Sequence, residues 1–135
     1  MSKGVPPELE TAVNRPVLAH LDGKSAHSDI AQVLMDAVKP LGDVQLYCPN
    51  WHDFRYVVAS TKGVIFGFEI GLNTVAFRLD DRMKQRALLT GGTAYADCGE
   101  DWVAVVHQGQ DSDWPAVDVR FWARKAYVHA REAST

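Results

Sequence analysis

Residues 56–79 contain three short segments in which apolar residues alternate with others, separated by two turn-forming sequences. The segments read YVVAS, VIFGFEI and TVAFRL, and the turns between them read TKG and GLN. Alternation with a period of two is typical of strands that bury one face, and short turns of this composition join antiparallel neighbours. The region therefore predicts a three-stranded antiparallel meander, which requires a β-sheet in the fold.

The alternation also predicts which side chains of the meander are buried. In the second segment the large apolar residues recur at every second position and are expected to share the dry face, namely Val64, Phe66, Phe68 and Ile70. Glu69 and Arg78 are expected together on the second face. If that face is open, they form a solvated pair that contributes up to about 1 kcal/mol. If it lines a groove, Arg78 would hold a carboxylate or phosphate, and both residues are candidate ligand-binding residues.

A helix and a short strand are expected before the meander. Ser25 or Ser28 can cap the helix, and apolar residues recur over positions 30–38 at the spacing of one helical face. Pro40 is expected to end this helix. Residues 44–48 then alternate in the manner of a strand.

A helix, a strand and a second helix are expected after the meander. Asp80 or Asp81 can cap a short helix with the sequence RMKQRALL, and the run WVAVVH at 102–107 predicts a strand. Ser112 or Asp113 can cap the last helix. The chain is therefore expected to end in a helix that packs back on the sheet.

The last helix carries apolar and basic residues whose spacing predicts how it lies. Phe121 and Val128 recur on one face and are expected to point inward. Trp122 does not share that direction and is expected to be exposed. Because an exposed tryptophan beside arginines is typical of interface hot spots, Trp122, Arg120 and Arg124 are candidate partner-binding residues.

The sequence NWHDFR at 50–55 concentrates polar and aromatic side chains between two predicted strands. Loops held by strands are common places for binding sites. His52 titrates near neutral pH, and Asp53 could orient it. Trp51, His52, Asp53 and Arg55 are therefore candidate ligand-binding residues, although the segment also fits a polar turn whose tryptophan covers the sheet edge.

Together these elements predict a single two-layer α+β domain over residues 25–135. Its antiparallel sheet has about five strands, and the helices that begin near Ser28 and Trp114 pack on one face. A chain of 135 residues is long enough to bury a core without a metal or a disulfide. Residues 1–24 are expected to form a partly irregular lead-in, with the apolar patch at 16–21 packed against the body.

Charge and motifs limit the function. The formal charge is −3, whereas domains that bind duplex nucleic acid usually carry a net positive charge. No zinc-ligand spacing and no GxSxG, HExxH, Walker A or GxGxxG motif occurs, so we expect no metal site and no cofactor. No leader sequence and no apolar run of the ~20 residues that span a bilayer is present, which favours a cytoplasmic protein without membrane contact.

The order of features from Gly63 onward resembles small α+β domains of the MmcQ/YjbR type and neighbouring families. The similar stretches are GVIFGF, TVAFRLDD before a short helix, GEDWVAVV, and a closing helix that contains KAY. They span about half of the chain. The resemblance implies an α+β domain, and members of such families are often labelled DNA-binding; it assigns no functional residue.

The sequence thus favours a soluble, non-catalytic binding or regulatory module whose partner is a protein or a small molecule. An alternative is a small-molecule binder or an enzyme with a pocket between the polar face of the sheet and the 50–55 loop. A further alternative is nucleic-acid binding through the basic faces of the helices, which carry Arg82, Lys84, Arg86, Arg120, Arg124 and Lys125.

Overall fold

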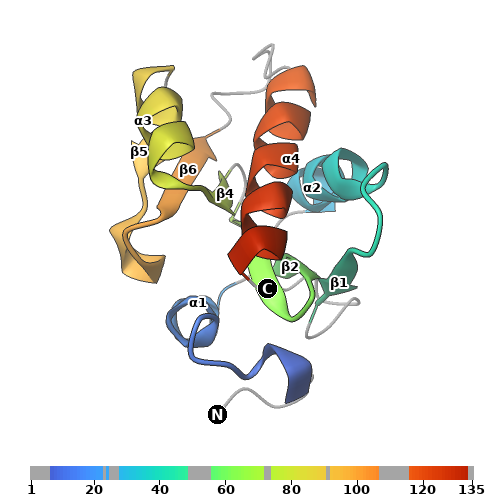
Figure 1. The fold of residues 1–135 in the computed structure, drawn as a ribbon. Coiled ribbons are helices and arrows are strands. Elements are labelled where there is room, and N and C mark those ends of the chain that lie inside the picture. The colour runs from blue at the N-terminus through green and yellow to red at the C-terminus, as the bar shows by residue number, and fades with distance from the viewer. Residues whose placement is uncertain are drawn as a thin grey trace.

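The structure is a computed structural model that describes residues 7–22, 24, 28–48, 56–71, 74–90, 92–106 and 116–133. Within this part of the chain, six strands form one open antiparallel sheet in the order β1-β2-β3-β4-β6-β5 (Figure 1). The strands are β1 (Gln45–Tyr47), β2 (Val57–Thr61), β3 (Val64–Ile70), β4 (Thr74–Arg78), β5 (Thr93–Ala94) and β6 (Trp102–Val106). The predicted α+β class and the antiparallel meander are confirmed. The additional strand β5 has two residues, too few for alternation to reveal it.

Four α-helices and two short 3-10 segments complete the described fold. They are α1 (Arg15–Leu21), α2 (Ser28–Val38), α3 (Asp81–Leu89) and α4 (Ala116–Ala133), with η1 (Pro7–Leu9) and η2 (Ala96–Cys98). The predicted cap of α3 is present, since the Asp80 carboxylate accepts a hydrogen bond from the N–H of Met83 at 2.8 Å. Among the described helices, none is both long and apolar enough to span a membrane.

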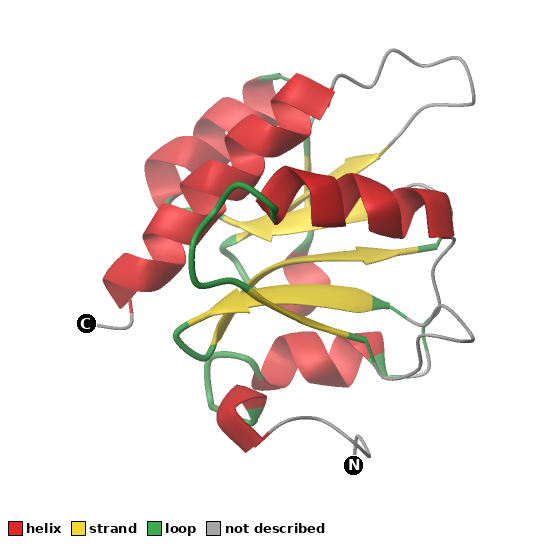
Figure 2. Ribbon diagram, turned by 90° about the vertical axis from the view of Figure 1, so that its right-hand side faces the viewer, coloured by secondary structure: helices red, strands yellow, loops and turns green. Residues whose placement is uncertain are grey.

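Helices cover both faces of the sheet (Figure 2). On one face α2, α3 and α4 pack over the α2–α4 core, which includes Phe66 and Phe77. On the other face α1, η1 and η2 pack over the α1 core, which includes Phe68 and Trp102. The predicted packing of α2 and α4 on one face is confirmed. The cover of the second face comes from the apolar patch at 16–21, which folds as α1 and buries its apolar side chains.

A β-bulge in β3 reverses the alternation of side chains along that strand. Phe68 pairs with Val58 and Gly67 with Ala59, but Ser60 pairs with Ile65, so Phe66 is an extra residue. Gly67 leaves room for the ring of Phe77, because a Cβ at this position would lie 3.1 Å from ring carbons. Phe66 therefore faces the α2–α4 core and Phe68 the α1 core, and the prediction that they share one face is wrong.

The register between β3 and β4 separates the two predicted ligand-binding residues of the meander. Glu69 lies opposite Val57 and Val75, which belong to the α2–α4 core. Arg78 lies opposite Trp102, which belongs to the α1 core. Because directly paired residues share a face, Glu69 and Arg78 lie on opposite faces. The prediction that they sit together on one open face is wrong.

Candidate functional site

The exposed sides of α3 and α4 form a continuous basic and apolar surface. We define the α3–α4 surface by seven side chains: Arg82, Arg86, Leu89, Arg120, Phe121, Arg124 and Lys125. All are exposed except Lys125, which is half-buried. Arg82 and Leu89 lie four and three positions from Arg86 along α3, so the three side chains are neighbours on the helix surface.

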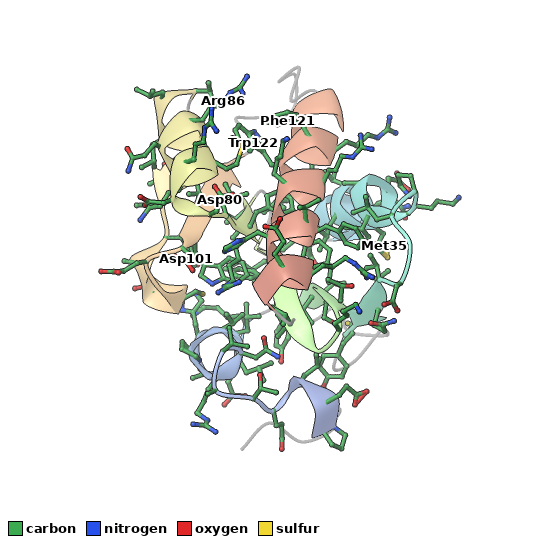
Figure 3. All side chains as sticks on the ribbon, viewed as in Figure 1. Met35, Asp80, Arg86, Asp101, Phe121 and Trp122 are labelled. Carbon is green, nitrogen blue, oxygen red and sulfur yellow. The ribbon has the colours of Figure 1, made fainter. Side chains whose placement is uncertain are left out.

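Phe121 lies at the centre of the α3–α4 surface and joins the two helices (Figure 3). The guanidinium carbon of Arg86 on α3 lies 5.5 Å from the centroid of its ring. The Nζ atom of Lys125, one turn along α4, also lies 5.5 Å from the centroid. Each contact is a cation–π interaction of about 0.5–1 kcal/mol at an exposed site. Two positive charges, contributed by two helices, thus lie over the ring.

Trp122 packs against Phe121 from the buried side of α4. The two rings meet edge to face, with centroids 4.7 Å apart. Trp122 is 8% exposed, whereas Phe121 is 36% exposed. The prediction that Trp122 is exposed and Phe121 buried is therefore wrong, and so is the inward direction expected for Val128, which is 45% exposed.

Small residues explain this rotation of α4. Its buried stripe contains Val119, Trp122 and three alanines, Ala123, Ala126 and Ala130. Alanine lets a helix axis approach the sheet closely, and the contact over β3 buries these positions completely. The sequence prediction placed the large apolar residues on the inner face. The three alanines, which recur at positions i, i+3 and i+7, mark the face that is buried.

The basic residues predicted for the last helix divide into two groups. Arg120 and Arg124 are exposed, as expected, and lie next to Phe121 on the same helix. Arg131 instead donates hydrogen bonds to Thr61 at 2.9 Å and to Asp43 at 3.2 Å. It therefore holds the end of α4 to the rest of the fold, and it is not part of the α3–α4 surface, to which Arg120, Arg124 and Lys125 belong.

Arg78 lies in a shallow hollow of about 270 Å³ on the α1 side of the sheet. Its Nη2 atom is 3.4 Å from a carboxylate oxygen of Asp101, while its Nη1 atom is buried and has no hydrogen-bond partner in the described part of the chain. Glu100 and Asp101 also line the hollow. Two carboxylates and one paired guanidinium leave no excess positive charge for an anionic ligand.

Glu69 is completely buried in the α2–α4 core. Neither carboxyl oxygen has a hydrogen-bond partner among the described residues. Burial raises the pKa of Glu69 to about 8, against a weaker opposing effect of the Val57 backbone. The side chain is therefore mainly protonated at neutral pH and faces no solvent from which a ligand would approach.

A contact that the sequence did not indicate joins α1 to the segment before β6. A hydrogen bond of 2.7 Å links Nε2 of His20 to the hydroxyl of Tyr95. Burial, together with the charge of Lys24, lowers the pKa of His20, and Asp97 opposes this effect. The neutral imidazole is the form that suits this contact.

The remaining predicted ligand-binding residues, Trp51, His52, Asp53 and Arg55, lie outside the described residues. Within the described ranges, no three histidine, cysteine or acidic side chains come together in a way that could hold a metal ion. Comparison of the chain with protein-family models, with curated proteins and with solved structures gives no match. The resemblance to domains of the MmcQ/YjbR type therefore stays a prediction.

Proposed function

We propose that the protein is a non-catalytic binding module that contacts a macromolecular partner through the α3–α4 surface. The observation that carries this proposal is the exposed ring of Phe121 in contact with both Arg86 and Lys125. Aromatic residues and arginine are the residue types most enriched at interface hot spots. Here they are combined on two helices that are both anchored in the core.

The support beneath Phe121 favours binding without rearrangement. Trp122 packs against the ring from the buried side, and Ala87 of α3 joins the same core. Association costs less conformational entropy when the contacting side chains are already held in place. A fixed aromatic side chain at the centre of a surface meets this condition.

The positions of Glu69 and Arg78 favour this proposal over a small-molecule site in the meander. The two residues lie on opposite faces of the sheet, so they do not line one pocket. Glu69 is buried and Arg78 is paired with Asp101. Exposed side chains gather instead on α3 and α4.

Leu89 offers a direct test of the proposed surface. This residue is 87% exposed and lies three positions from Arg86. A photo-crosslinking amino acid in place of Leu89, in cells that make the protein, is expected to yield a discrete crosslinked species. The matched control is the same amino acid in place of Leu46, which is 38% exposed on the edge strand β1.

The crosslinked species should disappear when Arg86→Ala and Phe121→Ala are added to the Leu89 variant. Equal crosslinking from positions 89 and 46, or no crosslinking from position 89, would contradict the proposed surface.

A further inference from the structure

The α3–α4 surface is positive on a protein that is negative overall. The chain has a formal charge of −3, yet five of the seven residues of the surface are arginine or lysine. Among the described side chains of α3 and α4, acidic residues occur only at Asp81 and Glu132, near opposite ends of the two helices. Asp118, near the start of α4, is a further acidic residue of this helix. Residues 82–89 of α3 and 119–131 of α4 include no acidic residue, so this part of the two helices carries net positive charge.

The contacts of Phe121 favour a partner that carries carboxylates over a nucleic acid. Bound single-stranded nucleic acid commonly stacks its bases on free aromatic faces. Arg86 and Lys125 lie over the Phe121 ring, and Trp122 meets it edge to face. Arg86 and Lys125 already cover part of the ring and leave less of it for a base, whereas a carboxylate can bind Arg86 or Lys125 while the cation stays on the ring.

Apolar residues on the α3–α4 surface and beside it add a second requirement. Leu89 and Val128 are 87% and 45% exposed, and they lie three and seven positions from Arg86 and Phe121 respectively. Residues at these separations share one side of a helix. Each helix therefore places an apolar side chain beside the cations, which suits a partner that carries apolar groups between its charges.

We propose that the partner is an acidic segment of a protein, with carboxylates on Arg86, Lys125 and Arg124 and an apolar side chain against Phe121 and Leu89. This inference rests on the proposed function of the α3–α4 surface. Polypeptides rich in glutamate and aspartate with interspersed leucine have this chemistry. Nucleic acid provides charge but lacks the aliphatic side chains.

Fluorescence anisotropy with labelled probes and the full chain tests the inference. The first probe is a short peptide of glutamate and aspartate around a central leucine, and its control has glutamine and asparagine in place of the acids. A third probe is single-stranded oligo-dT of equal charge. The acidic peptide is expected to bind, with affinity that falls as salt rises, while the neutral peptide and the oligonucleotide bind at least about tenfold more weakly.

Variants locate the binding. Arg86→Ala is expected to weaken the acidic peptide by about tenfold or more, as removal of a hot-spot arginine does. The matched control is Arg15→Ala, an exposed arginine of α1 on the other side of the sheet, which should leave the affinity unchanged. Arg86→Glu changes only an exposed side chain, and circular dichroism checks that each variant is folded.

The outcomes separate this inference from the proposed function. If oligo-dT binds more tightly than the acidic peptide and Arg86→Glu abolishes its binding, the surface is a binding site but the partner class is wrong. If the acidic peptide does not bind, or binds Arg86→Glu as tightly as the natural chain, the inference is overturned. The Leu89 crosslinking experiment decides the proposed function independently of these results.

Discussion

The two cores of this protein are held together in different ways. In the α1 core a buried polar residue, Asn14, is fully used: its amide donates to the carbonyl oxygens of Leu9 at 2.9 Å and Gly63 at 2.8 Å, and its oxygen accepts from the N–H of Ile65 at 2.9 Å. In the α2–α4 core a buried polar residue, Glu69, has no hydrogen bond to the described residues. Specific hydrogen bonds of a buried side chain therefore fix α1, whereas close apolar packing holds the middle of α4 and the hydrogen bonds of Arg131 hold its end.

Burial alone therefore does not define the role of a polar side chain in this protein. Asn14 joins η1 and α1 to the turn between β2 and β3, and thereby ties the N-terminal segment to the sheet. Glu69 destabilises the layer in which it lies, because an unpaired buried carboxyl group loses its hydration without a replacement. Substitution of Asn14 should therefore lower the free energy of unfolding, whereas a neutral substitution of Glu69 should raise it.

The largest effect is expected at Glu69 and depends on pH. The folded protein keeps the Glu69 proton up to a pKa of about 8, while an unfolded chain releases it near 4.5. Between these values the folded state binds more protons, so stability falls as pH rises through this window. Glu69→Gln should remove this fall and gain about 5 kcal/mol relative to the natural chain above pH 8.

Urea unfolding at a series of pH values measures this difference. The control variant is Glu10→Gln, which changes an exposed glutamate next to η1 and should leave the fall in stability in place. A natural chain whose stability does not fall between pH 5 and pH 8 would show that Glu69 is not a buried, unpaired acid.

Asn14→Ala is expected to have the next largest effect. The substitution removes two buried hydrogen bonds and one partly buried hydrogen bond, and leaves the N–H of Ile65 without its partner, which should cost about 3 kcal/mol. Asn14→Asp keeps the shape and the acceptor but loses both donors, so it should be at least as destabilising. Urea unfolding checks both variants, and full stability of Asn14→Ala would contradict the role of hydrogen bonding in the α1 core.

Tyr95→Phe should have the smallest effect. It removes the hydrogen bond to His20 at 2.7 Å and should lower the free energy of unfolding by about 1 kcal/mol. Hydrogen exchange should show faster exchange for the amides of α1, with those of α4 little changed. Equal acceleration in both helices would mean that the two cores are not separately stabilised.

The candidate site was predictable in part. The exposed Arg120 and Arg124 follow from the basic outer face of the last helix, and Arg86 and Lys125 belong to the basic residues noted in the sequence. The central aromatic residue was assigned wrongly, since Phe121 and Trp122 are adjacent and both fit an apolar face. The sequence did not indicate that Leu89 is exposed, because an apolar residue at the end of a helix is equally compatible with a place in the core.

Local sequence patterns were enough to predict the α+β class, the antiparallel meander, the positions of α2 and α3 and the Asp80 cap, because alternation, helical spacing and capping act between residues close in the chain. Four features could not be read from such patterns: the bulge at Phe66, the separation of Glu69 from Arg78, the rotation of α4 and the folding of residues 16–21 as a cover for the second face. These features depend on how side chains distant in sequence fit together, such as Phe77 over Gly67 and the alanines of α4 against the sheet. Packing at this level selects among arrangements that local patterns leave equally acceptable.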